Sequence, residues 1–276
     1  MAYRGLGALP VPVPKKWSPV FLIGCGRSGT TIIGKILNQH RSICLLNEPR
    51  HMWRAINRDT DIWYDGVNEG GKLSLGTSDV QHGESMRANR IFYMRQIVSR
   101  QPLLVEKLPI NSFRIAYLRQ LFPKCRIIHL LRHGLEVAHS IARTGPRWYG
   151  ANDSRKWRAL TKYGLQHGLS AVFLQNCKSS VERGLVEWTL SVEAVHAARE
   201  EITEDCFLEI RYDELLDEAT TTCRAVEQFL QLDRDAAMEV FANFVLHRNS
   251  TRADELIMPE QVCSRTTNLL TRLGFK

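Results

Sequence analysis

The sequence predicts an α/β protein with a P-loop-like, three-layer fold, in which a central, mostly parallel sheet of about five strands is flanked by helices. Three observations support this fold class. Apolar runs of strand length alternate with segments in which apolar residues recur every three or four positions. The first run ends in a glycine-rich turn that leads directly into a helical pattern, over residues 19–39. Repeated alternation of this kind builds parallel sheets whose crossovers are right-handed.

The first half of the chain contains three predicted strands. PVFLIG, at 19–24, is a short apolar run closed by glycine, and a stripe of aliphatic residues predicts a helix over 30–39. ICLLN, at 43–47, is the second predicted strand and runs into the charged segment EPR. PLLVE, at 102–106, is the third, and the apolar spacing that follows predicts a helix over 112–121.

The second half of the chain continues the alternation. CRIIHLL, at 125–131, is the fourth predicted strand, and a helix is expected to follow over 134–142. The remaining predicted elements are helices over 161–176 and 185–200, a fifth strand, CFLEI, at 206–210, and a mostly helical stretch over 213–246.

The chain is interpreted as a single domain over 1–276, because this length suits one sizeable core and is short for two full α/β domains. Residues 1–17 form a proline-punctuated leader that is expected to drape over the domain. Two segments, 59–90 and 143–185, are assigned to a lid or to ligand binding, because they contain polar, Gly- and Trp-punctuated parts without clear periodicity. Long irregular parts of this kind usually serve as lids or binding loops.

The composition narrows the kinds of partner. A formal net charge of +8 favours an anionic ligand or surface. The basic residues are scattered and no basic run is interleaved with aromatics, so no nucleic-acid partner is expected. No apolar run reaches transmembrane length, and no signal peptide is recognisable. The seven cysteines show neither a C-x-x-C pair nor a zinc spacing, so we expect buried, reduced thiols and a cytoplasmic location.

The stretch IGCGRSGTTIIGKILNQH, which begins at Ile23, carries the strongest local signal. From Gly24 to Thr31 it matches the phosphate-loop pattern G-x-x-x-x-G-K-[ST], except that Thr30 stands where the lysine is expected. Backbone N–H groups of 26–31 and the helix N-terminus would form an anion cradle. Side-chain donors are added by Arg27, Ser28, Thr30 and Thr31. The alternative is a tight strand-to-helix turn capped by a serine or threonine.

A nucleotide triphosphatase would need two features that this sequence lacks. One is the lysine at position 30, which Lys35 does not replace because it lies more than one helical turn further along. The other is an acidic strand end to hold Mg²⁺. The strand at 125–131 ends instead in Arg132, and Asp213 is a single carboxylate after a charged dipeptide. A metal-free phosphate site is therefore the better interpretation.

Arg132 and Ser140 form a second candidate anion site. Arg132 lies at the carboxyl end of its predicted strand, which is the edge where open α/β sheets bind ligands. Ser140 follows on the next helix, from which its hydroxyl can return beside the arginine. Together they could hold one phosphate, distinct from the phosphate in the loop, which indicates a nucleotide phosphorylated at both ends. The alternative is an unrelated surface arginine and helix serine.

Four segments in one order give a family resemblance: FLIGCGRSGTT, NEP, EKLP and LFPKCRIIHLLRHGLEVAHS. The chain resembles the sulfotransferases that use 3′-phosphoadenosine 5′-phosphosulfate (PAPS), and the order is similar to that of the tyrosylprotein branch. LLNEPRHMW also resembles the carbohydrate sulfotransferases, and EIRYDELL and RLGF are more loosely similar to bacterial, soluble relatives. The resemblance covers residues 20–60 and 103–143, which is less than half of the chain.

The resemblance assigns roles to individual residues. Glu48 falls on the branch's proposed base, and Lys107 falls on the lysine of its K-x-P segment. Arg132 and Ser140 would hold the 3′-phosphate. The sequence departs from the pattern where RHGLEV replaces RDGR and where a basic residue after the serine is absent; whether Tyr212 touches the cofactor stays open. The 5′-phosphosulfate would be held by Arg27, Ser28, Gly29, Thr30 and Thr31.

The implied reaction is sulfuryl transfer from PAPS to a hydroxyl of an acceptor, a glycan or small molecule, with adenosine 3′,5′-bisphosphate (PAP) as product. To catalyse such a transfer, a protein mainly has to position the reactants and stabilise the charge that develops. Arg27 and Lys107 would stabilise the leaving phosphate, so no metal is expected. Glu48 would take the proton of the acceptor hydroxyl. For Lys107 the alternative is a surface ion pair.

Other interpretations stay open from the sequence. Glu48 can instead form an ion pair with Arg50 or Arg54, and the rival base is His51. The chain could also be a P-loop kinase or NTPase with an atypical loop, or a non-enzymatic nucleotide-binding protein. Three histidines are interpreted as structural or peripheral: His129, His133 and His139. Five aromatic residues could either stack on a ligand or form the core of the flaps: Trp53, Trp63, Trp148, Tyr149 and Trp157.

Overall fold

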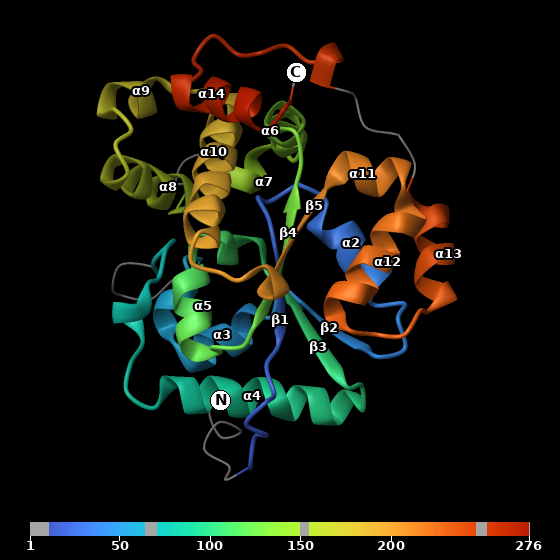
Figure 1. Cartoon of the computed structure of the whole chain (residues 1–276). Coiled ribbons are helices and arrows are strands. Elements are labelled where there is room, and N and C mark those ends of the chain that lie inside the picture. The colour runs from blue at the N-terminus through green and yellow to red at the C-terminus, as the bar shows by residue number, and fades with distance from the viewer. Residues whose placement is uncertain (1–10, 64–70, 150–154, 247–252, 276) are drawn as a thin grey trace.

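The computed structural model describes residues 11–63, 71–149, 155–246 and 253–275. Its five strands form one parallel sheet in the order β2-β3-β1-β4-β5 (Figure 1). Each strand lies within one residue of its predicted bounds, which confirms the α/β class and the central parallel sheet. The strands are β1 (Val20–Ile23), β2 (Ile43–Asn47), β3 (Leu103–Lys107), β4 (Arg126–Leu131) and β5 (Phe207–Arg211).

Helices cover both faces of this sheet. The α-helices of the described residues are α2 (Thr30–Leu37), α3 (Arg50–Ile56), α4 (Glu84–Ser99), α5 (Ile115–Leu121), α6 (Gly134–Arg143), α7 (Pro146–Tyr149), α8 (Arg155–Gln166), α9 (Ala171–Asn176), α10 (Ser180–Arg199), α11 (Tyr212–Asp217), α12 (Ala219–Leu230), α13 (Ala236–Val245) and α14 (Ser264–Arg272). Short 3₁₀ helices are η1 (Arg58–Thr60), η2 (Thr77–Asp79), η3 (Pro109–Phe113), η4 (Glu204–Cys206) and η5 (Ala253–Glu255).

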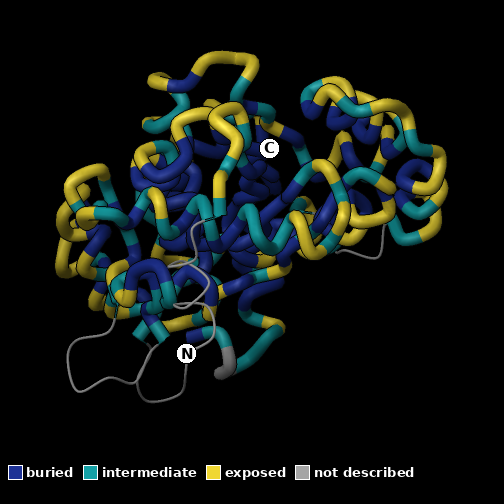
Figure 2. Tube along the Cα trace, turned by 90° about the horizontal axis from the view of Figure 1, so that it is seen from below, coloured by how far each residue is buried: buried dark blue, intermediate teal, exposed yellow. Residues whose placement is uncertain are grey.

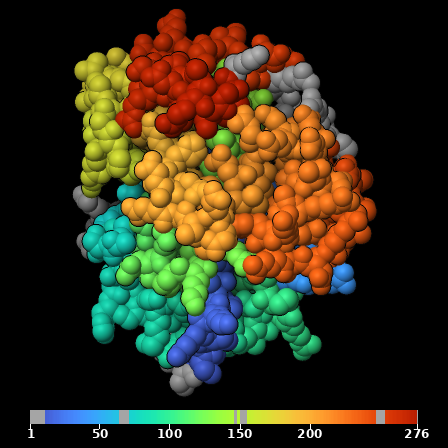
Figure 3. Space-filling view, viewed as in Figure 1, coloured from blue at the N-terminus to red at the C-terminus, as the bar shows by residue number. Residues whose placement is uncertain are grey.

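The three layers follow from the alternation of side chains along each strand. In β1, Phe21 and Ile23 pack into the larger apolar core, beneath α3, α4, α5, α6 and α10. Val20 and Leu22 pack into the second core, beneath α2, α11, α12 and α13. Figure 2 shows the buried trace in the middle of the molecule, and in the view of Figure 3 the orange surface of α11 to α13 lies to the right of the amber surface. Because the strands are buried on both faces, their sequences are nearly continuous runs of apolar residues.

The segment 59–90 contains more helix than the sequence predicted. Helix α4 already begins at Glu84, and its buried positions include Glu84, Ala88 and Ile91, which lie on one face. The first turn of α4 is polar, so apolar periodicity alone does not reveal its start. Residues 64–70 lie outside the described part of the chain.

The segment 143–185 is also largely helical. Helix α8 begins at Arg155, six residues before the predicted start. Its inward face is narrow and buries little more than Leu160 and Tyr163. The predicted helix over 161–176 is divided in two at Gly168, whose φ of 84° ends α8. A polar helix with a sparse apolar stripe gives a weak periodic signal, which explains the missed start.

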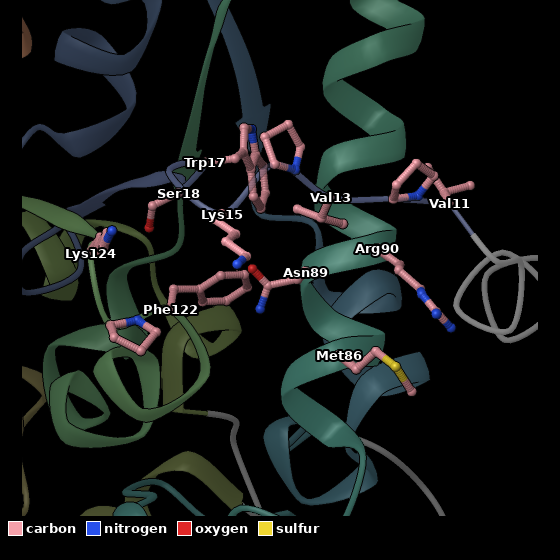
Figure 4. A pocket seen from close by; sticks show the side chains of 13 residues that line it. Val11, Val13, Lys15, Trp17, Ser18, Met86, Asn89, Arg90, Phe122 and Lys124 are labelled. Atoms are coloured by element: carbon pink, nitrogen blue, oxygen red, sulfur yellow. The ribbon is translucent and has the colours of Figure 1, made fainter.

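The leader is described from residue 11 onward and lies against α4. The Trp17 indole donates to Gln96 Oε1 at 2.5 Å and meets the ring of Tyr93 edge-on, with the centroids 5.4 Å apart. This segment, Met86 of α4 and Phe122 line a hollow of about 460 Å³. Figure 4 shows the side chains that line it. The hollow lies next to Ser18, at the amino-terminal end of β1, so it is separate from the carboxyl ends of the strands.

No helix within the described ranges is long and apolar enough to cross a membrane. All seven cysteines lie in described ranges, each is free, and five of them are buried, as the sequence predicts.

Candidate active site

The loop between β1 and α2 has the backbone that its phosphate-loop pattern predicts. Gly29 has φ 101°, and a Cβ there would lie 2.5 Å from the ring of Tyr212, so only glycine fits. Helix α2 begins immediately afterwards at Thr30, with no side-chain hydrogen bond capping it. Arg27 also has a positive φ of 72°, which few non-glycine residues adopt and which recurs at ligand sites.

In the second candidate anion site, the two predicted residues have different hydrogen-bond partners. Ser140, predicted beside Arg132, accepts a hydrogen bond from Arg27 Nε at 3.3 Å through its hydroxyl. Arg132 donates instead to Glu136 Oε2 at 2.8 Å, and its guanidinium lies 4.4 Å from the centroid of the Tyr212 ring. The loop arginine and the helix serine are therefore neighbours, and Tyr212 joins Arg132 to the loop at Gly29.

Glu48 and Lys107 meet at the carboxyl ends of β2 and β3, as their positions predict. The strand register pairs Asn47 with Lys107, which places Glu48 immediately beyond Lys107. Lys107 Nζ donates to Glu48 Oε1 at 2.8 Å and to Thr31 Oγ1 of the loop at 3.1 Å. The Lys107 side chain is 1% exposed, so its ion pair is not the surface pair that the sequence left as an alternative.

Glu48 also forms the ion pair that was its alternative interpretation. Arg50 Nη2 lies 3.1 Å from Glu48 Oε2, so the carboxylate has a cation on each side. Partial burial opposes ionisation, but the hydrogen bonds and charges of Lys107 and Arg50 outweigh it and lower the pKa of Glu48. The residue has φ 49° just before Pro49, an unfavourable backbone that is typical of functional positions.

A cavity of about 320 Å³ opens beside this carboxylate. Two of its aromatic walls each carry a cation: Arg50 lies 3.9 Å from the Trp63 centroid, and Lys156 lies 3.9 Å from that of Trp148. His51, the rival base, is an exposed residue of α3 and is not among the described residues that line this cavity. The lining residues are Cys25, Gly26, Glu48, Arg50, Trp63, Leu73, Leu108, Pro109, Ile110, Phe113, Trp148, Lys156, Glu187 and Ser191.

The family model described as "Sulfotransferase family" matches residues 19–236, which is well over half of the chain. The chain belongs to the sulfotransferase family. It is 26% identical over 204 residues to protein-tyrosine sulfotransferase A of Caenorhabditis elegans, covering 71% of this chain and 50% of that protein. It is 22% identical over 251 residues to the protein-tyrosine sulfotransferase of Drosophila melanogaster, covering 87% and 44%. The chain thus spans half or less of the length of the curated relatives it matches.

The fold of this sulfotransferase-family chain is shared with a solved structure. The sulfotransferase domain from the curacin biosynthetic pathway superposes with a TM-score of 0.60 at 16% identity. The match covers 94% of this chain and 99% of that domain. This likeness confirms the fold.

Glu187 organises a polar part of the cavity wall, and no sequence motif pointed to it. It is 3% exposed and accepts hydrogen bonds from Trp148 Nε1 at 3.0 Å, Tyr149 Oη at 2.9 Å and Lys156 Nζ at 2.6 Å. The wall fits closely, since a Cβ on Gly26 would lie 2.5 Å from the Trp148 ring. The only local signal was a charge inside the apolar face of α10.

The aromatic residues of the two flaps separate into two groups. Trp63 and Trp148 line the cavity, as a ligand-binding role would require. Trp53 is 2% exposed in the larger core and Tyr149 is 3% exposed, so both are core residues. Trp157 packs against the Tyr149 ring with the centroids 5.9 Å apart.

Glu106, the neighbour of Lys107 in β3, points to the opposite face of the sheet and into the core. Its carboxyl accepts from Trp53 Nε1 at 2.7 Å and from Asn111 Nδ2 at 3.1 Å. Complete burial outweighs these hydrogen bonds and raises the pKa of Glu106 to about 8. The native protein therefore holds this carboxyl protonated at neutral pH.

This raised pKa makes stability depend on pH. The contribution of Glu106 is fully present below its unfolded pKa near 4.5 and is lost as pH rises through about 8, because only the unfolded chain releases the proton in that window. We expect a slope of about 1.36 kcal/mol per pH unit from this group. Urea unfolding between about pH 5 and 8 should show a shallower decline for Glu106→Gln than for the wild type.

Glu239→Gln is the matched control for that measurement, because ion pairs with Arg234 and Arg224 lower the pKa of Glu239 and keep its titration out of this window. Equal slopes for Glu106→Gln and the wild type would show that the native protein ionises Glu106.

Strand pairing also gathers a group that no local spacing revealed. His129 of β4 lies opposite Glu209 of β5, and His129 Nδ1 and His196 Nε2 lie 2.9 and 3.2 Å from Glu209 Oε2. The three possible ligand atoms lie within 4.8 Å of one another, and two imidazoles with a carboxylate are ligands that zinc accepts. However, His129 Nε2 is buried with no hydrogen-bond partner in the part of the chain that the structure describes, whereas metal-ligating imidazoles usually have their second nitrogen held.

His133 and His139, which were interpreted as structural or peripheral, each contact the backbone. The His133 side chain accepts a hydrogen bond from Leu135 N and so caps α6. His139 Nε2 lies 3.0 Å from the carbonyl oxygen of Ile257.

Proposed function

We propose that this member of the sulfotransferase family transfers a sulfuryl group from PAPS to a hydroxyl of an acceptor, a glycan or small molecule, and releases PAP. The observation that carries the proposal is the contact of Lys107 Nζ with both Thr31 Oγ1 of the loop and Glu48 Oε1. It joins the anion-binding loop, a buried cation and a carboxylate at one edge of the sheet. A carboxylate that faces a cavity is then in reach of both the donor loop and an acceptor.

The residues of the loop fit the phosphosulfate end of PAPS. Gly29 gives the loop its positive φ, and α2 begins at Thr30 with N–H groups that no side chain caps. Ser28, Thr30 and Thr31 contribute hydroxyls, and Arg27 and Lys107 contribute positive charge. The loop lacks the lysine of a triphosphatase, but Lys107 at the end of β3 places an ammonium beside it.

Arg132 and Ser140 are proposed to hold the 3′-phosphate. The contact of Ser140 with Arg27 puts this serine next to the loop, so one nucleotide could reach both the serine and the loop. Arg132 is buried and fixed by Glu136, so its guanidinium is oriented before any ligand binds. Tyr212, which packs on both Arg132 and Gly29, would then connect the two phosphate sites.

When bound, PAPS supplies the sulfuryl group, whose bond to the 5′-phosphate oxygen breaks as the acceptor oxygen bonds to sulfur. Glu48 accepts the proton of the acceptor hydroxyl. Arg27 and Lys107 stabilise the negative charge that develops on the leaving phosphate. These two cations make a resident metal unnecessary in the proposed mechanism.

The setting of the reaction is also part of the proposal. Seven free cysteines, five of them buried, support a reducing, cytoplasmic compartment. The single parallel sheet of the described residues supports treating the chain as one domain.

Calorimetric titration tests the donor site. We expect PAP to bind equally well in EDTA and in Mg²⁺, and ATP to bind in neither, because the site offers fixed cations in place of a metal-holding carboxylate. Formation of a sulfated product from PAPS and an acceptor panel, followed by mass spectrometry, tests the transfer. Binding of ATP that requires Mg²⁺, without binding of PAP, would favour a kinase or NTPase and overturn the proposal.

A further inference from the structure

The wall of the cavity beside Gly26 carries a polar cluster that the proposed reaction does not use. It consists of Lys156 from α8 and of Glu187 and Ser191 from α10. We infer that Lys156, which Glu187 holds in place, and Ser191 bind a second oxygen of the acceptor. The acceptor would then be a compact, mostly apolar molecule with one hydroxyl that is sulfated at Glu48 and one further oxygen that is recognised here. This inference rests on the proposed function.

The cluster and Glu48 line the same cavity, and each lies close to the loop at a different residue. Glu48 reaches the loop through Lys107 and Thr31. Glu187 reaches it at Gly26, where its Oε1 would lie 3.4 Å from an added Cβ. A molecule in the cavity can therefore contact both groups at once.

Ser191 is the part of the cluster that most directly indicates a ligand. It lines the cavity and is 1% exposed, yet its hydroxyl has no hydrogen-bond partner among the described residues. A buried hydroxyl without a partner costs about 1–3 kcal/mol. An acceptor oxygen in the cavity would supply the partner that the chain itself does not.

Lys156 supplies the charge, and Glu187 fixes where that charge lies. An ammonium has three N–H donors, and the contact with Glu187 Oε1 uses one of them. The Glu187 carboxylate accepts from Trp148, Tyr149 and Lys156, which uses three of its about four acceptor positions and holds the Lys156 ammonium in place. The cluster thus offers donors, which select an oxygen acceptor such as a carbonyl, an ether or a hydroxyl. The pairing of Lys156 with Glu187 leaves the cluster neutral, so a carboxylate is not required.

The rest of the cavity defines the body of the molecule. Its volume of about 320 Å³ lies near the lower end of the range for small-molecule sites. Most of the remaining lining is apolar or aromatic, and it includes Leu108, Ile110, Phe113, Trp63 and Trp148. Among the acceptors of the proposed function, this favours a small molecule over a glycan chain.

The test uses two acceptors that differ in one distant oxygen: 4-butylphenol and 4-(4-hydroxyphenyl)butan-2-one. Their reacting hydroxyls are alike because the ketone is not conjugated to the ring. We expect kcat/KM with PAPS to favour the ketone by about ten- to a hundredfold, as for a hydrogen bond to a charged group. Lys156→Met and Ser191→Ala should each reduce that preference, with Lys156→Met having the larger effect.

Two features keep the test interpretable. Ser191→Ala removes no hydrogen bond within the described residues, so its thermal stability should match the wild type. Lys162→Met, at an exposed position of the same helix as Lys156, is the matched control and should keep the full preference. Binding of both molecules to the PAP-loaded protein is measured in parallel by calorimetry.

The outcomes separate this inference from the proposed function. Equal kcat/KM and equal binding of the two molecules, binding of neither, or a preference that survives both variants, would overturn the subsite. Preferential binding of the ketone without any sulfated product would keep the subsite and overturn sulfuryl transfer.

Discussion

Replacing Lys107 by methionine should lower turnover by about 10²–10³-fold, the loss typical of removing one group that stabilises developing charge. Lys107 Nζ contacts Thr31 of the loop and Glu48 at the same time, so in the proposed mechanism this cation would act on both the donor and the base. Its side chain is 1% exposed, and charges in such a poorly solvated setting interact more strongly than they do in water. Steady-state kcat with saturating PAPS and acceptor is the measurement.

Lys35→Met is the matched control, since Lys35 is an exposed lysine of α2, the helix that follows the loop. It should leave kcat unchanged. Urea unfolding of both variants shows whether a lost buried ion pair has altered the fold, and Lys107→Arg, which keeps the charge, should retain more turnover than Lys107→Met. Wild-type turnover in a folded Lys107→Met protein would contradict the proposed role, and an equal loss of turnover in Lys35→Met would show that the effect is not specific to Lys107.

The sheet and the loop could be predicted because their signals are local. Each strand is a short, nearly continuous apolar run, as expected for strands buried on both faces. The contact of Glu48 with Lys107 was also accessible, because carboxyl ends of parallel strands share one edge and these residues end two of the strands. The sequence did not show that the two strands are neighbours, since that depends on the order β2-β3-β1-β4-β5.

The remaining parts of the site depend on contacts between distant segments. Ser140 contacts Arg27, which lies 113 residues away in the sequence. The competing partner of Arg132 was within reach of sequence reasoning, because Glu136 is four residues on, at helical spacing. Glu187 and Lys156 offered no comparable signal, since tertiary packing alone brings α8, α10 and the loop together.

Glu48 and Glu106 lie near the carboxyl ends of neighbouring strands, and their different environments give the two carboxyl groups different pKa values. Glu106 has amide and indole donors but complete burial, and its pKa is raised to about 8. Glu48 has two cations and a partly exposed side chain, and its pKa is lowered. Of the two, Glu48 is ionised at neutral pH and faces the cavity, so it is the one that can accept a proton there.

Glu48→Gln should therefore lower kcat by about 10²–10⁴-fold, the usual contribution of a positioned base. Glutamine keeps an oxygen for Lys107 but cannot take the proton. PAP should bind at least as tightly to the variant, because the substitution removes a negative charge 2.8 Å from Lys107 Nζ. Since the lowered pKa of Glu48 keeps it ionised above its ordinary value near 4.5, wild-type kcat/KM should show no acid limb from this group above about pH 5.

Glu239→Gln provides the matched control for this substitution as well, because Glu239 is an ion-paired carboxylate of α13 that does not line the cavity. It should change neither kcat nor PAP affinity. If Glu48→Gln kept full turnover while binding PAP, the proton acceptor would be another group, and His51→Asn would be the next variant to test. If it lost both turnover and PAP binding, Glu48 would serve the donor site through Lys107, not the acceptor hydroxyl. Only lost turnover with retained PAP binding assigns the proton to Glu48.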